Sequence, residues 1–297
     1  MNNLLKLPIL IIFFCSFQLL ATPLSPNLLT EEGDSYYIHK QYNLAHLYYS
    51  ELFKKQPNPM TGSRLLLVSL RQNDTKTTEK LMMYQFQPDF TFDYLSLYSS
   101  LVLNRSVMTD LISNRLQKTS QLINKQSQFE YLMGAQLINS QEFKAAKTLY
   151  SKLSLENNEI GQQSHQILND LEQIESLPSK SPWAAALFST VIPGAGQIYS
   201  RQYSDGIMAF FWTASFLGGA IYTNRLETMS NMPHYGSSLF GFFGLMFYAS
   251  NIVCRYSSAH RYNTFYQRKF VERLRKIHFS IDIIEEFSGI EFSRPIR

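Results

Sequence analysis

Three uncharged apolar runs in the second half of the chain restrict its fold more than any other feature. They cover residues 183–199, 206–223 and 236–254, and none contains Asp, Glu, Lys or Arg. Each run is near the lower end of the roughly 17–25 residues with which a helix crosses a bilayer. A buried helical hairpin of a water-soluble domain is the alternative, because the runs are short. Three such runs in succession, in a chain whose other half is polar, favour a small bundle of transmembrane helices.

The N-terminus has the pattern of a secretory signal. Residues 1–21 contain one cation, Lys6, then an apolar run over residues 7–20, and they end at the small residue Ala21. This order of charged, apolar and small residues is typical of export signals, and the apolar run is shorter than the roughly 20 residues of a spanning helix. Cleaved or retained as an anchor, this segment predicts that the residues after it lie on the exported side of the membrane.

A helical repeat pattern covers residues 30–176. Its two clearest copies lie 101 residues apart (146 − 45), which is close to three periods of about 34 residues. The signature residues are Tyr42, Ala45, Tyr49 and Pro57 in the first copy, and Phe143, Ala146 and Tyr150 in the second. A large residue, a small Ala, an aromatic residue four positions later and a closing Pro resemble the tetratricopeptide repeat. The sequence between the two copies predicts degenerate units of the same kind.

Stacked helix pairs form a concave surface that commonly holds peptides. Tyr36, His46 and Tyr48 are candidates to face such a peptide; the alternative is that they belong to the repeat core or to ordinary surface. Residues 177–182, which are rich in Pro and Ser, predict a linker to the membrane region. The repeat domain is therefore expected to bind a protein or peptide partner.

Charge after the third apolar run predicts the topology. Residues 255–278 carry seven Lys and Arg residues and one acid, Glu272. Because loops rich in Lys and Arg remain in the cytoplasm, this segment is expected there, which three spans allow and two do not. If the first run, with Pro193 and Gly194, is re-entrant, the assignment reverses. The segment also reads as a basic amphipathic helix lying on anionic lipid, while residues 279–297 are too short and mixed for an assignment.

Small residues follow a spacing of four in the second and third runs. They are Ala214 and Gly218 in one, and Ser237 and Gly241 in the other. This spacing lets helices approach closely in lipid. It would also allow two copies of the chain to associate through these faces.

Catalytic and cofactor motifs are missing from the sequence. The stretch "PGAGQIY" has no Lys for a nucleotide-binding P-loop and no third Gly for a dinucleotide fold. The six His residues are scattered, no spaced His, Cys, Asp and Glu set predicts a metal, and no nucleophile elbow is present. The net charge of +4 is too small to favour nucleic acid. We therefore expect no catalytic residue, no cofactor, no metal and no nucleic-acid partner.

The C-terminal arrangement resembles a known family. "SPWAAALFSTVIPGAGQIYSRQYSDGIMAFFW", followed later by "AHRYN", is similar to a bacterial integral-membrane domain family of unknown function, and less closely to the two-transmembrane hairpin family. A departure is Ser-Arg-Gln at 200–202, where a glycine is common. The resemblance implies a bacterial envelope protein and no particular activity. The motif residues are Pro193, Gly194, Gly196, Gln197, Tyr199, Asp205 and Gly206.

Four polar residues near the membrane segments remain to be explained. Gln197, His260, Tyr262 and Asn263 could form a small polar site at the membrane face that binds a lipid head group or a partner helix. The alternative is that they form hydrogen bonds with backbone groups freed by the kink at Pro193, because polar groups buried near lipid must have a hydrogen-bond partner.

Together these features predict an all-α protein in which a tetratricopeptide-like helical repeat domain precedes a small transmembrane helical bundle. The expected function is a non-enzymatic protein–protein interaction scaffold of the bacterial envelope. The alternative is a transport factor or a protein-insertion and assembly factor that acts through its transmembrane helices. The expected location is the inner membrane, with the repeat domain in the periplasm and the basic tail in the cytoplasm.

Overall fold

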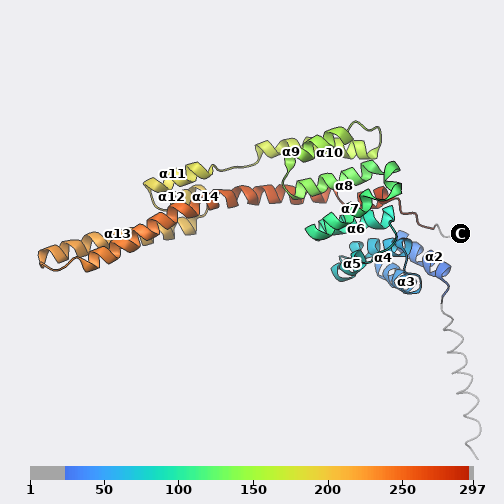
Figure 1. The fold of residues 1–297 in the computed structure, drawn as a ribbon, viewed down its shortest axis with the longest axis horizontal. Helices are drawn as coiled ribbons and strands as arrows, with labels where there is room; N and C mark the ends of the chain where they lie inside the picture. The colour runs from blue at the N-terminus through green and yellow to red at the C-terminus, as the bar shows by residue number, and fades with distance from the viewer. Residues whose placement is uncertain (1–23, 294–297) are drawn as a thin grey trace, which may run out of the picture. The chain divides into compact units, whose positions relative to one another are not determined.

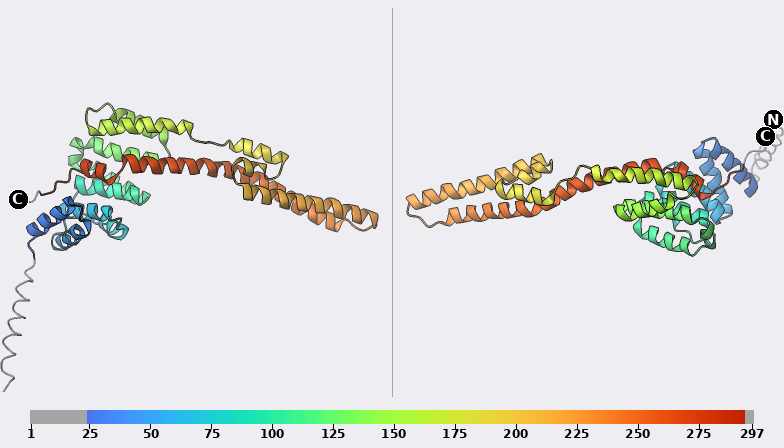
Figure 2. Two further views of the ribbon diagram at one scale, coloured as in Figure 1. Left: turned by 180° about the vertical axis from the view of Figure 1, so that it is seen from behind. Right: turned by 90° about the horizontal axis from the view of Figure 1, so that it is seen from above.

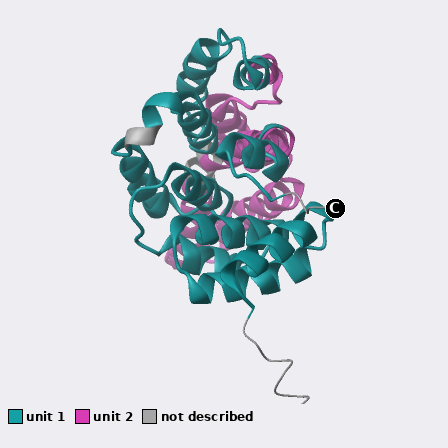
Figure 3. Ribbon diagram, turned by 90° about the vertical axis from the view of Figure 1, so that its right-hand side faces the viewer, with its two compact units in different colours: residues 1–165, 278–297 teal, residues 166–277 magenta. Residues whose placement is uncertain are grey.

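The computed structural model describes residues 24–293, except for the side chains of residues 120–121 and 251–256 (Figure 1). Every described element is a helix, so the prediction of an all-α chain is confirmed. The chain forms two compact units (Figure 3). Unit 1 comprises Met1–His165 and His278–Arg297, and unit 2 comprises Gln166–Ile277. The expected signal segment, residues 1–21, lies outside the described residues.

Unit 1 is built from successive pairs of antiparallel helices. The helices of each pair contact each other, and α4 and α6 also contact the first helix of the next or previous pair. Ser25, Asn58 and Asp89 begin the first helices of three pairs by accepting a hydrogen bond from a backbone N–H, as N-cap residues do. The elements are α2 (Pro26–Ile38), α3 (Tyr42–Lys55), α4 (Pro59–Arg71), α5 (Thr75–Met82), α6 (Phe90–Val102), α7 (Ser106–Gln117), η1 (Ser120–Asn124), α8 (Gln126–Asn139), α9 (Phe143–Leu153) and α10 (Glu159–Glu172), which continues into unit 2.

The first and last pairs repeat the same packing. Ala45 and Tyr49 of α3, and Ala146 and Tyr150 of α9, are fully buried. A Cβ atom on Gly33 of α2 would lie 2.5 Å from the Tyr49 ring, and one on Gly134 of α8 would lie 2.4 Å from the Tyr150 ring. These two glycines are also 101 residues apart (134 − 33). The repeat therefore includes a glycine that lets the aromatic ring of the second helix pack against the backbone of the first.

Unit 2 contains a broken helical segment and a long hairpin. Its elements are η2 (Gln173–Ser176), α11 (Pro182–Val191), α12 (Ala195–Tyr199), α13 (Tyr203–Met229) and most of α14 (Tyr235–His278). The first apolar run is divided between α11 and α12, because the chain leaves helical geometry at Ile192 and Gly194 has a φ of 90°. The second run lies within α13 and the third within the first half of α14. The basic segment continues α14 without a break.

Aromatic side chains join α13 to the first half of α14, and the two helices run side by side (Figure 2). The ring of Phe216 lies 5.7 Å from that of Phe243 and 5.2 Å from that of Phe247. Among the described residues, α13 is the one helix that is long and apolar enough to cross a membrane, and little of it is buried in the protein. The described helices therefore support one membrane-crossing segment by length and composition, and the expected three-helix bundle goes beyond them.

The apolar face of the basic segment is partly covered by protein. Ala259, Phe270 and Leu274 are buried, whereas Ile277 is half exposed. This face was expected to lie on anionic lipid. Three of its apolar positions are buried within the protein, and contact of the segment with lipid stays a prediction.

Candidate functional site

The inner face of unit 1 is formed by the first helix of each pair and holds the C-terminal segment of the same chain. That segment consists of residues 278–293, including helix α15 (Ile281–Ser288), which ends at Gly289 with a φ of 70°. Helix α15 contacts α4 and α6. We call residues 278–293 the C-terminal strap.

Side chains of the inner face recognise the backbone of the strap. Each of the four first helices, α2, α4, α6 and α8, supplies at least one such contact. The bonds are Tyr131 Oη to His278 O (2.8 Å), Tyr98 Oη to Phe279 O (2.9 Å), Thr91 Oγ1 to Ser288 O (3.0 Å), Arg64 Nη2 to Glu291 O (2.8 Å), and Ser293 N to Asp34 Oδ2 (2.8 Å). Contacts to the peptide backbone fix the position of a bound segment and depend little on its side chains.

A buried ion pair anchors one end of this face. Arg64 and Asp34 are 4% and 0% exposed, and Arg64 Nε lies 2.8 Å from Asp34 Oδ1. A second bond joins Arg64 Nη2 to Asp34 Oδ2 at 3.1 Å, and the hydroxyl of Tyr49 donates to Oδ1 at 2.7 Å. Burial, followed by the neighbouring charge of Asp34, raises the pKa of Tyr49 well above its usual value, so its hydroxyl remains a donor. A buried pair of this kind is costly to break, because removing one partner leaves the other charge uncompensated.

A second arginine binds two carboxylates of the strap. Arg71 Nη1 donates to Asp282 and Nη2 donates to Glu285, each at 2.5 Å, and Nε donates to the hydroxyl of Tyr37 at 3.0 Å. That hydroxyl in turn donates to Glu285 Oε2 at 2.6 Å. Burial and the bond to Glu285 raise the pKa of Tyr37. Burial alone would lower the pKa of Arg71, but its bonds to Tyr37 and Glu285 raise it, so the guanidinium stays charged.

Aromatic contacts hold both ends of the strap. Phe292 stacks on Tyr37 with ring centroids 4.6 Å apart, and the guanidinium of Arg64 lies 5.9 Å from the centre of its ring. At the other end, the ring of Tyr131 lies 5.3 Å from that of Phe279 and 5.2 Å from that of Phe287. The strap is therefore bound by apolar packing as well as by polar contacts.

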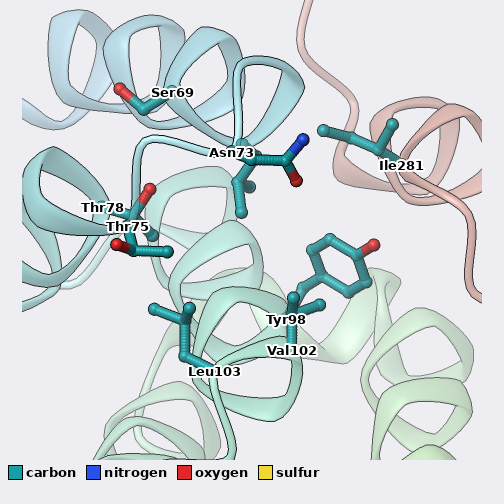
Figure 4. A pocket seen from close by; sticks show the side chains of 9 residues that line it. Ser69, Asn73, Thr75, Thr78, Tyr98, Val102, Leu103 and Ile281 are labelled. Carbon is teal, nitrogen blue, oxygen red and sulfur yellow. The ribbon is translucent and has the colours of Figure 1, made fainter.

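A cavity of about 210 Å³ lies beside the strap (Figure 4). Its walls carry hydroxyl, amide and aliphatic groups, and no charged side chain lines it. The described part of the chain also has no group of three or more His, Cys, Asp or Glu side chains that could hold a metal. No carboxylate, imidazole, ammonium or thiol group therefore lies beside these hydroxyls in the wall of the cavity. The lining residues are Ser69, Leu70, Asn73, Thr75, Thr78, Tyr98, Val102, Leu103 and Ile281.

The position of the strap adds a condition to the expected topology. Residues 278–297 belong to the same compact unit as the repeat helices. Two parts of one packed unit lie on the same side of any membrane. If the protein is attached to a membrane, residues 278–293 and the helices of unit 1 are therefore on one side of it. The side on which the basic segment, residues 255–278, lies stays a prediction.

The residues expected to face a peptide lie elsewhere. The rings of Tyr36 and Tyr48 are 5.2 Å apart, and His46 Nε2 lies 3.7 Å from Asp74. The strap is contacted instead by Tyr37, one position after Tyr36. Among the signature residues of the first repeat, Tyr42 lies close to the site, because its ring is 5.3 Å from that of Tyr37. Pro57 follows the end of α3, and Phe143 begins α9.

The glycine motif of unit 2 brings three helices into close contact. A Cβ atom on Gly194 would lie 2.1 Å from the carbonyl oxygen of Gly206, and one on Gly196 would lie 2.1 Å from that of Ala185. The N–H of Gly196 donates to Ser189 Oγ at 2.6 Å. Of the remaining motif residues, Pro193 precedes the turn, Tyr199 ends α12, and Asp205 is exposed in the first turn of α13.

The four polar residues of unit 2 have different surroundings. Asn263 Oδ1 accepts from the N–H of Lys180 at 2.8 Å, and Asn263 Nδ2 donates to the carbonyl of Lys180 at 3.0 Å. The ammonium of Lys180 lies 5.9 Å from the centre of the Tyr262 ring. Gln197 is buried with no partner for Oε1 in the described chain, and His260 is exposed. Asn263 therefore satisfies backbone groups of the linker rather than groups at Pro193.

No family model, curated protein or solved structure matches this chain.

Proposed function

We propose that this protein is a non-enzymatic, membrane-attached scaffold of the bacterial envelope, and that the inner face of its helical repeats binds peptide segments. The observation that carries the proposal is the set of backbone contacts to the strap from all four first helices. The matched Ala, Tyr and Gly positions of the first and last helix pairs support a tetratricopeptide-like repeat. In this structure the strap occupies the inner face of unit 1.

We further propose that α13 and the first half of α14 attach the protein to the inner membrane. The exposed apolar surface of α13 supports this attachment. The N-terminal segment favours the exported side for the repeat domain, and the strap then lies on that side as well. The Lys and Arg residues of 255–278 then also lie on the exported side, whereas the positive-inside rule predicts that they lie in the cytoplasm.

A labelled synthetic peptide of residues 278–293 tests the peptide-binding function. The full chain in nanodiscs would carry the two changes Glu285→Lys and Phe292→Ala. They weaken the binding of the chain's own strap and leave the residues of the inner face unchanged. We expect this double variant to bind the peptide at least tenfold more tightly than the wild type, because the competing segment of the same chain is weakened. Fluorescence polarisation measures the binding.

Specificity is checked by one change on the inner face. Adding Tyr98→Phe to the double variant removes the hydroxyl that donates to Phe279 O. Because a single hydrogen bond contributes about 0.5–1.5 kcal/mol, we expect its loss to weaken peptide binding roughly 2–10-fold. A scrambled peptide of the same composition is the control. If Tyr98→Phe leaves the binding unchanged and the scrambled peptide binds as tightly as the strap peptide, the inner face is not a peptide site.

A further inference from the structure

We propose that α11 and α12 form a re-entrant loop, which enters one leaflet of the bilayer and returns to the face from which it came. Its partner is the acyl-chain region of that leaflet. The inference rests on the proposed membrane attachment of α13 and α14. Helix α14 is continuous and rises about 1.5 Å per residue, so the residues of α14 that contact successive parts of the chain give the positions of those parts along its axis.

The segment begins beside Asn263 of α14. Both hydrogen bonds of the Asn263 amide go to the backbone of Lys180, at 2.8 and 3.0 Å. Ser181 then caps α11 by accepting from the N–H of Ala184. The start of α11 is thus fixed at the level of residue 263.

The far end of α11 lies beside Tyr248. The hydroxyl of Tyr248 donates to the carbonyl of Thr190 at 2.6 Å. Tyr248 precedes Asn263 by 15 positions (263 − 248), which corresponds to about 22 Å along α14. Between Lys180 and Thr190 the chain has therefore travelled along α14 toward the tip of the hairpin.

The chain returns before α13 begins. Gln202 Oε1 accepts from Arg261 Nη2 at 3.3 Å, which is again close to the level of Asn263. The close approach of Gly194 to Gly206 shows how the turn is closed. Only then does α13 run out along α14, with Phe216 against Phe243. Entry and exit of the α11–α12 segment are therefore at the same level.

The length and surface of α11 suit one leaflet. Its ten residues extend about 15 Å, half of the roughly 30 Å hydrocarbon core. Trp183, Leu187 and Val191 are spaced by four and are 75%, 65% and 79% exposed, whereas Ala185 and Ser189 on the other side are fully buried. One face of the helix is thus apolar and open along its whole length.

Backbone groups at the break between α11 and α12 have hydrogen-bond partners within the protein. Irregular backbone at membrane depth is tolerated only where its polar groups are satisfied within the protein. The Thr190 carbonyl accepts from Tyr248, and the N–H of Gly196 donates to Ser189 Oγ. The loop leaves two crossings, α13 and the first half of α14, which return the chain to the side of the repeats. The packing of the strap in unit 1 also requires that the chain returns to the side of the repeats after α14.

Cysteine labelling in sealed vesicles tests the loop. In the full chain with Cys15 and Cys254 replaced by Ala, single changes Lys180→Cys, Gln202→Cys and Asn231→Cys would be treated with a membrane-impermeant maleimide, with Glu51→Cys marking the side of the repeats. We expect residues 180 and 202 to be labelled from the side of residue 51, and residue 231 from the other side. Labelling of residues 180 and 202 from opposite sides would overturn the re-entrant loop.

A depth measurement completes the test. The chain has two Trp residues, 183 and 212, and Val191→Trp in a background with both replaced by Phe reports the tip of the loop. We expect lipids brominated on their acyl chains to quench its fluorescence at least twofold. If Val191→Trp is not quenched while residue 231 is labelled from the far side, the loop is wrong and the attachment stands. If residue 231 is labelled from the side of residue 51, the proposed attachment itself fails.

Discussion

Replacing Arg64 by alanine is expected to lower the free energy of unfolding of unit 1 by about 3–5 kcal/mol. Asp34 is fully buried, and Arg64 is its ion-pair partner. Without Arg64 the carboxylate keeps the hydroxyl of Tyr49 and the N–H of Ser293 as donors, but no opposite charge remains beside it. The strap also loses the bond to the carbonyl of Glu291. Urea denaturation of the full chain in detergent, followed by circular dichroism, measures the loss.

A surface pair provides the matched control. Arg105 pairs with Glu79 on the same unit, but their side chains are 56% and 35% exposed. Exposed pairs contribute at most about 1 kcal/mol, so Arg105→Ala should be nearly neutral. Combining Arg64→Ala with Asp34→Asn should cost less than the two changes added together, because the uncompensated charge is removed. Equal losses for Arg64→Ala and Arg105→Ala would contradict the assignment of a buried anchor.

Gly196→Ala is the second change with a large expected effect. The added methyl group would lie 2.1 Å from the carbonyl oxygen of Ala185 and 2.5 Å from Ser189 Oγ. The first of these is backbone, so relief requires α12 to move away from α11. Overpacking of this kind costs roughly 1–3 kcal/mol and shifts the backbone. We expect a lower melting temperature in nanodiscs and faster proteolysis between α11 and α13.

Gly218 is the control for this change. A Cβ atom at Gly218 of α13 would meet nothing within 4 Å. Alanine is also the better helix former by about 1 kcal/mol, so Gly218→Ala should be neutral or slightly stabilising. If the two variants melt alike, the close contact of α11 with α12 is not present in the membrane-embedded protein.

The matched packing of the first and last helix pairs was predictable because its signal is local. Ala45 and Tyr49 lie on one face of one helix, and their copies recur in register. The glycine that accompanies each pair, Gly33 and Gly134, follows the same register but carries no hydrophobic signal of its own. The role of this glycine is visible only in the structure, where the Tyr ring of the second helix packs against it.

The strap could not be predicted from local pattern. Arg71 and Glu285 are separated by 214 positions, and neither residue is unusual for an exposed helix. Residues 281–288 make a short amphipathic helix whose partner surface is formed by four other helices. Recognition of this kind depends on the assembled surface, so composition and periodicity do not reveal it.

The first apolar run shows a limit of counting uncharged residues. Residues 183–199 are long enough by number, but a spanning helix also needs an unbroken ladder of backbone hydrogen bonds. Pro193 has no N–H to donate, and Gly194 adopts a left-handed conformation that ends the helix. The charge rule was combined with three crossings, so the side that it predicts for the basic segment depends on whether this broken run crosses the membrane.

The central claim is that the strap occupies the inner face of the repeats. Photo-crosslinking from position 292 tests this claim most directly. The full chain in membranes would carry benzoylphenylalanine in place of Phe292, whose ring stacks on Tyr37 at 4.6 Å. After irradiation, mass spectrometry should find an intramolecular link to the peptides that contain Tyr37 or Arg64. The same probe in place of Phe210, an exposed residue of α13, should react with lipid instead. A Phe292 probe that links to lipid or to other proteins, and never to α2 or α4, would contradict the account.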